Sequence, residues 1–88
     1  MIDVAIIGAG ELGGSLAHVL ARREIVRRIQ LIDPSGQIAA GKALDIMQTG
    51  ALDGFDCTVT GTSDYKDIAG SDVVIVTAGV PRAFVGQP

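Results

Sequence analysis

The sequence predicts an α/β fold in which helices pack against a parallel sheet, and three observations support this prediction. Short apolar runs alternate with segments of helical periodicity along the 88 residues. The order is strand, helix, strand, helix, strand, turn, strand, and such alternation requires a parallel sheet with right-handed crossovers. Hydrophobic residues make up 48% of the chain and charged residues 19%, which is a globular composition. We therefore expect four parallel strands in the spatial order 3-2-1-4.

The first strand and the first helix have the clearest patterns. Residues 2–7 are largely β-branched and end at Gly8, which is typical of a parallel strand buried on both faces. From Glu11 onward, apolar residues recur at helical spacing and predict one apolar helix face. The residues of this expected face are Leu12, Leu16, Val19 and Leu20. Gly13 and Ala17 are small and lie four residues apart, so the helix can approach a strand closely.

Two pairs of arginines follow this helix. Arg22-Arg23 and Arg27-Arg28 flank residues 24–26, and we interpret both pairs as the solvated end of the helix. They form no longer basic stripe, and 7 basic against 10 acidic residues give the chain a net charge of −3. Because non-specific nucleic-acid affinity depends on neutralising phosphates, this charge balance argues against a nucleic-acid partner.

The middle of the chain continues the alternation. Residues 29–32 predict a strand that ends at Asp33-Pro34, and Ser35-Gly36 is a turn sequence. A second helix is expected over about residues 37–49, with its C-terminal cap at Gly50. The apolar residues in register on one face of this helix are Ala40, Ala43, Leu44 and Met47.

Three shorter elements complete the predicted sheet. Within residues 57–61, Thr58 and Thr60 alternate with Cys57, Val59 and Gly61, which predicts a strand half exposed to solvent. Residues 64–69 predict a short helical turn. Residues 73–76 form the most apolar strand, whereas residues 80–88 lack periodicity and are expected to be a loop.

The most informative motif joins the first strand to the first helix. Residues 8–13 fit the pattern G-x-G-x-x-G, with the sequence Gly8-Ala9-Gly10-Glu11-Leu12-Gly13. A dinucleotide pyrophosphate needs a tight turn, a close backbone approach and free helix N–H groups with positive dipole. Gly8 suits the turn, Gly10 the close approach, and Gly13 the contact between helix and strand. The motif therefore predicts the first half of a Rossmann-type fold.

An acidic residue strengthens this prediction. Asp33 ends the second strand, 20 residues after Gly13, where its carboxylate can accept hydrogen bonds from the adenosine ribose hydroxyls. A carboxylate there also disfavours a 2′-phosphate, so we expect NAD rather than NADP. Two alternatives stay open. The glycines can serve only a tight turn, with Asp33 a solvated turn residue, or the ligand can be a flavin or an S-adenosyl compound.

Five sequence blocks, taken together, resemble the lactate/malate dehydrogenase family, and its malate dehydrogenases above all. They are Gly8-Ala9-Gly10, Leu16-Ala17-His18, residues 41–45, residues 61–65 and residues 71–82. The most specific are Gly41-Lys42-Ala43-Leu44-Asp45 and Thr77-Ala78-Gly79-Val80-Pro81-Arg82. The resemblance covers residues 1 to about 82 and implies hydride transfer between NAD and the malate/oxaloacetate pair, a reaction of the tricarboxylic acid cycle.

The resemblance also implies roles for individual residues. Residues 8–13, including the backbone of Glu11 and Leu12, correspond to the pyrophosphate loop, and Asp33 corresponds to the ribose acid. Thr77, Ala78 and Gly79 match the segment that passes beneath the cofactor. Arg82 matches an arginine that grips the second carboxylate of malate, which a guanidinium can bind bidentately; the alternative is a solvated loop charge. Residues 1–79 then form the NAD-binding half-domain, and residues 80–88 begin a truncated substrate loop.

The chain departs from the family pattern in three respects. Glu11 is anionic beside the expected pyrophosphate site. Pro88 stands where the family has a second arginine, and the family's catalytic histidine and aspartate have no counterpart. We therefore expect no catalytic residue within this chain and no activity from the 88 residues alone. His18, the sole histidine, and Cys57, the sole cysteine, are expected to be structural.

The remaining expectations concern location and partners. One cysteine allows neither an internal disulfide nor a cysteine-based zinc cluster, and no apolar run is long enough for a membrane span, so we expect a cytoplasmic protein without a metal. A homo-oligomer, or association through an exposed sheet edge, is expected. The alternatives to a malate dehydrogenase are a lactate dehydrogenase fragment, a stand-alone nucleotide-binding module and a non-binding assembly piece.

Overall fold

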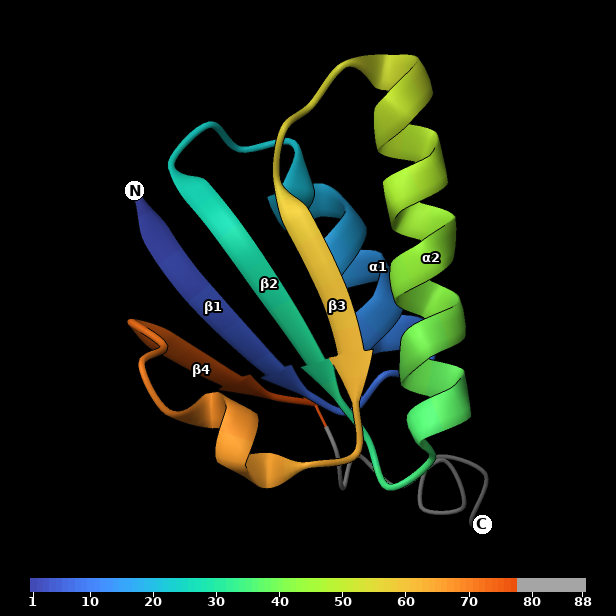
Figure 1. Ribbon diagram of the computed structural model, residues 1–88, viewed down its shortest axis with the longest axis vertical. Helices are drawn as coiled ribbons and strands as arrows, with labels where there is room; N and C mark the ends of the chain where they lie inside the picture. Colours follow the sequence, from blue (N-terminus) through green and yellow to red (C-terminus); the bar gives the residue numbers. More distant parts are fainter. Residues whose placement is uncertain (78–88) are drawn as a thin grey trace, which may run out of the picture.

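A computed structural model describes residues 1–77, which form a four-stranded parallel sheet with helices packed against it (Figure 1). The elements are β1 (Ile2–Ile7), α1 (Glu11–Ala21), β2 (Val26–Ile32), α2 (Gly36–Asp53), β3 (Thr58–Thr62), the short 3₁₀ helix η1 (Tyr65–Ile68) and β4 (Val73–Val76). The strand order β3-β2-β1-β4 and the parallel pairing confirm the predicted sheet. The predictions for Ala78, Gly79, Arg82 and residues 80–88 lie outside the described residues.

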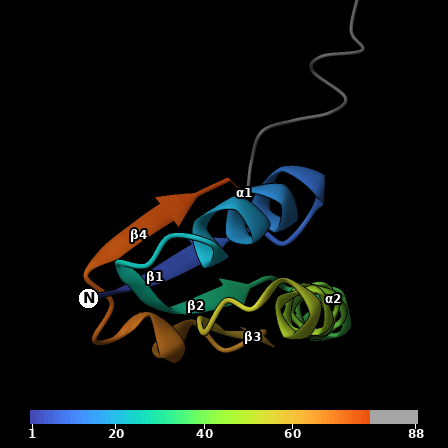
Figure 2. The same ribbon diagram turned by 90° about the horizontal axis from the view of Figure 1, so that it is seen from above.

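The layers follow from the connections. Helices α1 and α2 lie on one face of the sheet, and η1 lies on the other (Figure 2). All four arrowheads point the same way, so the chain leaves β1, β2, β3 and β4 at one common edge (Figure 1). We call this the carboxyl edge; it carries residues 8–10, 33–35 and Thr77. The opposite, amino edge carries Asp3, Arg27, Arg28 and Asp72.

The buried face of α1 agrees with the prediction at Gly13 and Ala17, which are buried, and differs from it at two larger residues. Small residues face the sheet, whereas Leu12 and Val19 are 60% and 54% exposed, so the prediction for these two was wrong. Leu16 and Leu20 are half-buried and pack against the core from the sides. The buried residues of the helix are Gly13, Gly14, Ala17 and Ala21. Small side chains let the helix axis lie close to the sheet, which turns the bulky residues outward.

The second arginine pair lies in a strand, which corrects its interpretation as a helix end. Helix α1 ends at Ala21, and β2 already begins at Val26, so Arg27 and Arg28 belong to β2. The Arg27 guanidinium donates to both carboxylate oxygens of Asp3 in β1, at 3.0 and 2.7 Å. This cross-strand partner accounts for two charged residues near the start of a strand that is mostly buried.

Helix α2 is longer than predicted and is rotated about its axis. It extends to Asp53 and ends at Gly54, whose φ of 82° is left-handed, so the predicted cap at Gly50 was wrong. Gly50 lies inside the helix, where an added Cβ would overlap the Phe55 ring. The buried residues are Ala39, Ala43, Ile46 and Gly50, whereas the predicted Ala40, Leu44 and Met47 are exposed. Both sets have helical spacing, and the set with small residues packs closer to β3.

The remaining elements agree with the predictions. Cys57 and Val59 are buried while Thr58 and Thr60 are exposed, as the alternation predicts for a half-exposed strand. η1 occupies the predicted helical turn, and the Asp64 carboxylate caps it by accepting the Lys66 N–H at 2.9 Å. The core lies between the sheet and the two long helices, with Ile6, Ile29 and Leu31 fully buried at its centre.

Candidate functional site

The glycine loop leaves β1 at the carboxyl edge of the sheet. Gly8 has a φ of 104°, a conformation that side chains rarely adopt, and its N–H donates to the carbonyl of Ile32 at 2.7 Å. The next residue, Ala9, is fully buried. Gly8 thus makes the tight turn that the motif predicts and turns the chain from β1 into α1.

The N-terminus of α1 has no side-chain cap. Its N-cap residue is Gly10, and no side chain accepts a hydrogen bond from the first turn. The N-terminus of α2 differs, because the Ser35 hydroxyl accepts the N–H of Ile38 at 3.3 Å. The first N–H groups of any helix lack intrahelical partners and carry a positive partial charge. Those of α1 are therefore free of side-chain partners and suited to an anionic ligand.

Gly10 and Gly13 have opposite surroundings. Gly10 is exposed, and a Cβ built on it would meet no protein atom within 4 Å, so the space beside it is open. A Cβ on Gly13 would overlap the carbonyl oxygen of Gly8, so the first turn of α1 packs directly on the loop. The open space at Gly10 is what a close ligand approach requires, whereas Gly13 is fixed by packing within the protein.

Asp33 follows β2 and reaches across to the glycine loop. Its Oδ2 accepts the Ala9 N–H at 2.9 Å, and its Oδ1 accepts the Ser35 N–H at 2.9 Å. None of the ion pairs within residues 1–77 includes Asp33, and the side chain is half-buried. A carboxylate has about four acceptor positions, so each oxygen can still accept a hydroxyl. Because the Ala9 N–H already donates to Asp33, this N–H stabilises the loop and is not free to bind a ligand.

Thr77 lies beside the glycine loop at the end of β4, on the side of β1 opposite to Asp33. Its backbone N–H donates to the Ile7 carbonyl at 2.8 Å, which continues the β1–β4 ladder. Its hydroxyl lies 3.1 Å from the Ile7 carbonyl oxygen and 3.0 Å from that of Gly8. Sequence patterns gave Thr77 only a place in a segment and missed this hydroxyl. The available signal was a hydroxyl-bearing residue at the end of a strand that was predicted to lie beside the glycine loop.

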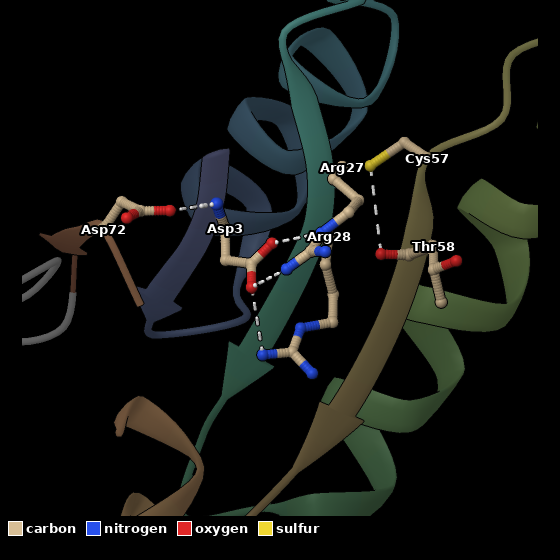
Figure 3. A network of polar contacts seen from close by, with 6 residues as sticks. All are labelled: Asp3, Arg27, Arg28, Cys57, Thr58 and Asp72. Carbon is tan, nitrogen blue, oxygen red and sulfur yellow. Dashed lines mark hydrogen bonds and ion pairs between the residues drawn. The ribbon is translucent and has the colours of Figure 1, made fainter. Parts of the chain in front are cut away.

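The amino edge has a different character. The Asp3 carboxylate lies between Arg27 and Arg28, while the Asp3 N–H donates to the Asp72 carboxylate at 2.7 Å (Figure 3). The hydrogen bond to Arg27 outweighs burial and holds the pKa of Asp3 below its usual value. A hollow of about 670 Å³ lies nearby, between the α1–β2 and α2–β3 turns. It contains none of the predicted binding residues.

His18 and Cys57 lie away from the carboxyl edge. His18 is half-buried in α1, and its Nε2 has no hydrogen-bond partner among the described residues. Cys57 is buried before β3, and burial raises the pKa of its thiol, which disfavours the reactive thiolate. Within residues 1–77, no three His, Cys, Asp or Glu side chains gather as a metal site, and no helix is long and apolar enough to cross a membrane.

Comparisons with known proteins agree with this geometry. The family model for the lactate/malate dehydrogenase NAD binding domain matches residues 2–86. A malate dehydrogenase of Pelagibacter ubique is 49% identical over 82 residues, which cover 93% of this chain and 26% of that protein. The chain thus spans about a quarter of the length of this relative.

Two solved structures extend the comparison. A malate dehydrogenase from Archaeoglobus fulgidus in complex with NADH is similar with a TM-score of 0.84 and 30% identity, covering 92% of this chain and 28% of that chain. A lactate dehydrogenase from Cryptosporidium parvum, complexed with lactic acid and its cofactor, is similar with a TM-score of 0.83 and 41% identity, covering 91% and 25%. Both malate dehydrogenases and lactate dehydrogenases therefore occur among the structural relatives.

Proposed function

This chain belongs to the lactate/malate dehydrogenase family, at its NAD-binding domain, and we propose that it binds the adenosine side of NAD in a malate dehydrogenase. The observation that carries the proposal is the uncapped N-terminus of α1 beside Gly10, where a Cβ would meet no protein atom. A pyrophosphate there would accept the first-turn N–H groups and gain from the helix dipole. Glu11 is exposed in the same turn, and its anionic side chain cannot bind a pyrophosphate. We therefore propose that Glu11 contributes only its backbone N–H to the ligand.

The choice of NAD over NADP rests on Asp33. Two backbone N–H groups hold its carboxylate next to the loop, and no ion pair within residues 1–77 neutralises it. The remaining lone pairs suit the two ribose hydroxyls, whereas a 2′-phosphate would meet an uncompensated negative charge. Within residues 1–77 the arginines, at positions 22, 23, 27 and 28, lie toward the amino edge, so none of them is placed to neutralise such a phosphate.

The proposed reaction is hydride transfer between NAD and the malate/oxaloacetate pair, in the tricarboxylic acid cycle. The support is the Thr-Ala-Gly-Val-Pro-Arg block, in which Arg82 would hold the second carboxylate of the substrate; Ala78 and Gly79 would lie beneath the cofactor. We propose no catalytic residue within residues 1–77, because a general acid must reach the substrate and His18 is held in α1. A lactate dehydrogenase is the alternative, and Arg82 argues against it.

A homo-oligomer and a cytoplasmic location complete the proposal. The outer edge of β4 has no strand beside it in the described sheet, and Val73, Val74 and Val76 are exposed there. Such an edge supports association with further polypeptide, because its backbone groups are unpaired. The single free thiol, Cys57, is consistent with a reducing compartment.

Calorimetry with NAD and NADP tests the proposal directly. We expect NAD to bind the chain, and NADP to bind more weakly because of the charge of Asp33. Equal affinities would contradict the role of Asp33, and absence of NAD binding would contradict the site itself. Intact-mass measurement of the natural protein, set against the 9.0 kDa of this chain, separates a full dehydrogenase from a stand-alone module.

A further inference from the structure

One peptide group of the glycine loop is held at both ends by side chains. The carbonyl oxygen of Gly8 is 3.0 Å from the Thr77 hydroxyl, which shares its one proton between this oxygen and the Ile7 carbonyl oxygen at 3.1 Å. The N–H of Ala9, on the other side of the Gly8–Ala9 peptide bond, donates to Asp33 Oδ2 at 2.9 Å. Thr77 follows β4 and Asp33 follows β2, and these are the two strands that flank β1. The loop that leaves β1 is therefore fixed from both neighbouring strands.

These two contacts select one orientation of the peptide. If the Gly8–Ala9 peptide turned over, its carbonyl oxygen would face the Asp33 carboxylate, and two acceptors would meet without a proton between them. Glycine has no Cβ to restrict its backbone, and Gly8 adopts a φ of 104°. The Gly8 N–H is held by the Ile32 carbonyl at 2.7 Å, and the side chains of Thr77 and Asp33 add the restraint on the peptide that follows it.

The orientation of this peptide reaches the first turn of α1. The Gly8 carbonyl oxygen lies against Gly13, where a Cβ would overlap it, and the Thr77 hydroxyl oxygen would be 3.1 Å from that Cβ. Helix α1 can start where it does only while the carbonyl of Gly8 keeps its place. The Thr77 hydroxyl is thus linked, through one carbonyl group, to the N–H groups at the start of α1.

We propose that Thr77 is a positioning residue for the diphosphate of the bound dinucleotide. Its hydroxyl acts through the carbonyl of Gly8 and keeps the loop and the first turn of α1 in the binding conformation. This inference rests on the proposed function, because it takes the glycine loop as the diphosphate site. The hydroxyl group of Thr77 thus positions the loop, whereas its backbone N–H continues the pairing of β4 with β1.

The test compares two ligands on the full chain and its Thr77→Val variant. ADP-ribose carries the diphosphate, whereas adenosine carries the ribose hydroxyls without phosphate. Loss of one hydrogen bond of ordinary strength should weaken ADP-ribose by about 2–12-fold in calorimetry. Adenosine, followed by NMR titration, should keep its affinity, and Thr77→Ser should restore ADP-ribose binding because it restores the hydroxyl.

Thr49→Val is the matched control. The Thr49 hydroxyl also donates to a backbone carbonyl, that of Asp45 at 3.0 Å, but within α2, and its loss should leave both affinities unchanged. Unaltered ADP-ribose binding by Thr77→Val would overturn the inference about Thr77 but not the proposed function. So would equal losses for both ligands, or a serine variant that fails to recover. If the unaltered chain binds no ADP-ribose, the proposed function falls and the inference falls with it.

Discussion

Two aspartates at opposite edges of the sheet show how the same side chain is used in different ways. Asp3 at the amino edge is buried, and its carboxylate is neutralised by the guanidinium groups of Arg27 and Arg28. Asp33 at the carboxyl edge is half-buried and, within residues 1–77, accepts hydrogen bonds from two backbone N–H groups. The first carboxylate is committed to cross-strand contacts, while the second has no counter-ion within residues 1–77 and retains part of its acceptor capacity.

The difference between the edges indicates where this fold can bind a ligand. Parallel strands bring their carboxyl ends, and the loops that follow, to one edge, where ligands of open α/β sheets bind. There, backbone N–H groups of α1 lack a side-chain cap and Asp33 lacks a counter-ion within residues 1–77. At the amino edge Arg27 and Arg28 pair with Asp3. A site is therefore recognised by the polar groups that the fold leaves available.

The largest expected effect is on cofactor binding, in Asp33→Asn. The Asn side chain has one acceptor oxygen and no negative charge. It therefore cannot accept the N–H groups of both Ala9 and Ser35 and also bind the ribose hydroxyls as strongly as a carboxylate does. Because hydrogen bonds to charged groups contribute about 1.5–3 kcal/mol, NAD affinity should fall by about 10–150-fold. The NADP loss should be smaller, and it measures the contribution of Asp33 to the loop alone.

The matched control is Asp72→Asn at the amino edge. Asp72 also accepts a backbone N–H, that of Asp3, and is exposed. Calorimetry should show unchanged NAD affinity for this variant. If Asp72→Asn weakens NAD as much as Asp33→Asn does, the two edges are not functionally distinct.

The next effect in size concerns the open space beside Gly10. Gly10→Ala should fold normally, because the added Cβ meets no protein atom and the φ of −68° suits alanine. The methyl group would occupy space proposed for the pyrophosphate, and overpacking of this kind costs about 1–3 kcal/mol, or about 5–150-fold in affinity. Calorimetry and a thermal melt together check this. A variant with unchanged melting temperature and unchanged NAD affinity would show that no ligand approaches Gly10.

The carboxyl edge could be predicted from the sequence because its signals are local. The glycine motif fixes the turn after β1, and Asp33 ends the next strand, so chain order alone brings the loop and the acid together. Contacts between distant residues could not be predicted in the same way. Asp3 and Arg27 are 24 residues apart, and Thr77 and Gly8 are 69 apart. Both contacts depend on strand register, which the periodicity of a single strand does not give.

The buried faces of the helices were predicted only in part, for a related reason. In α1, both the leucine set and the small-residue set have helical spacing, and only contact with the sheet selects Ala17 and Ala21 over Leu12. Hydrophobicity ranks leucine above alanine, whereas the close approach of helix and sheet favours the smaller side chain. In α2 the buried face combines the small Ala39 with the large Ile46, while Leu44 is exposed, so contact with the sheet and not residue size alone selects it.

A third prediction compares two ion pairs. Arg27→Met would leave the buried Asp3 carboxylate with only Arg28, at 3.3 Å, whereas Arg22→Met would remove an exposed pair with Asp53 at 2.7 Å. Exposed pairs contribute about 0.2–1 kcal/mol, so the loss of Arg22 should shift the melting temperature little. The loss of Arg27 should lower it clearly more, because a buried charge loses its main partner. Equal shifts in differential scanning fluorimetry would show that Asp3 behaves as a surface residue.

A fourth and smaller effect is the acid dependence of the same contact. The pKa of Asp3 lies below its usual value when folded, because the Arg27 guanidinium binds its charged form. The contact therefore stabilises the fold fully above about pH 4 and loses this contribution as the pH falls through the lowered pKa. The difference in melting temperature between the natural chain and Asp3→Asn should be constant near neutral pH and shrink in acid. A difference that grows in acid would reverse the assigned direction.

The smallest expected effect comes from a second glycine with open surroundings. Gly41 lies on the exposed side of α2, and a Cβ there would meet no protein atom within 4 Å, as at Gly10. Because glycine is unfavourable inside a helix, Gly41→Ala should stabilise the fold by about 0.5–1 kcal/mol and leave NAD affinity unchanged. Gly50→Ala, in the same helix, should destabilise it because its Cβ would overlap the Phe55 ring. Chemical denaturation measures both signs, and a loss of NAD affinity in Gly41→Ala alone would extend the binding surface to α2.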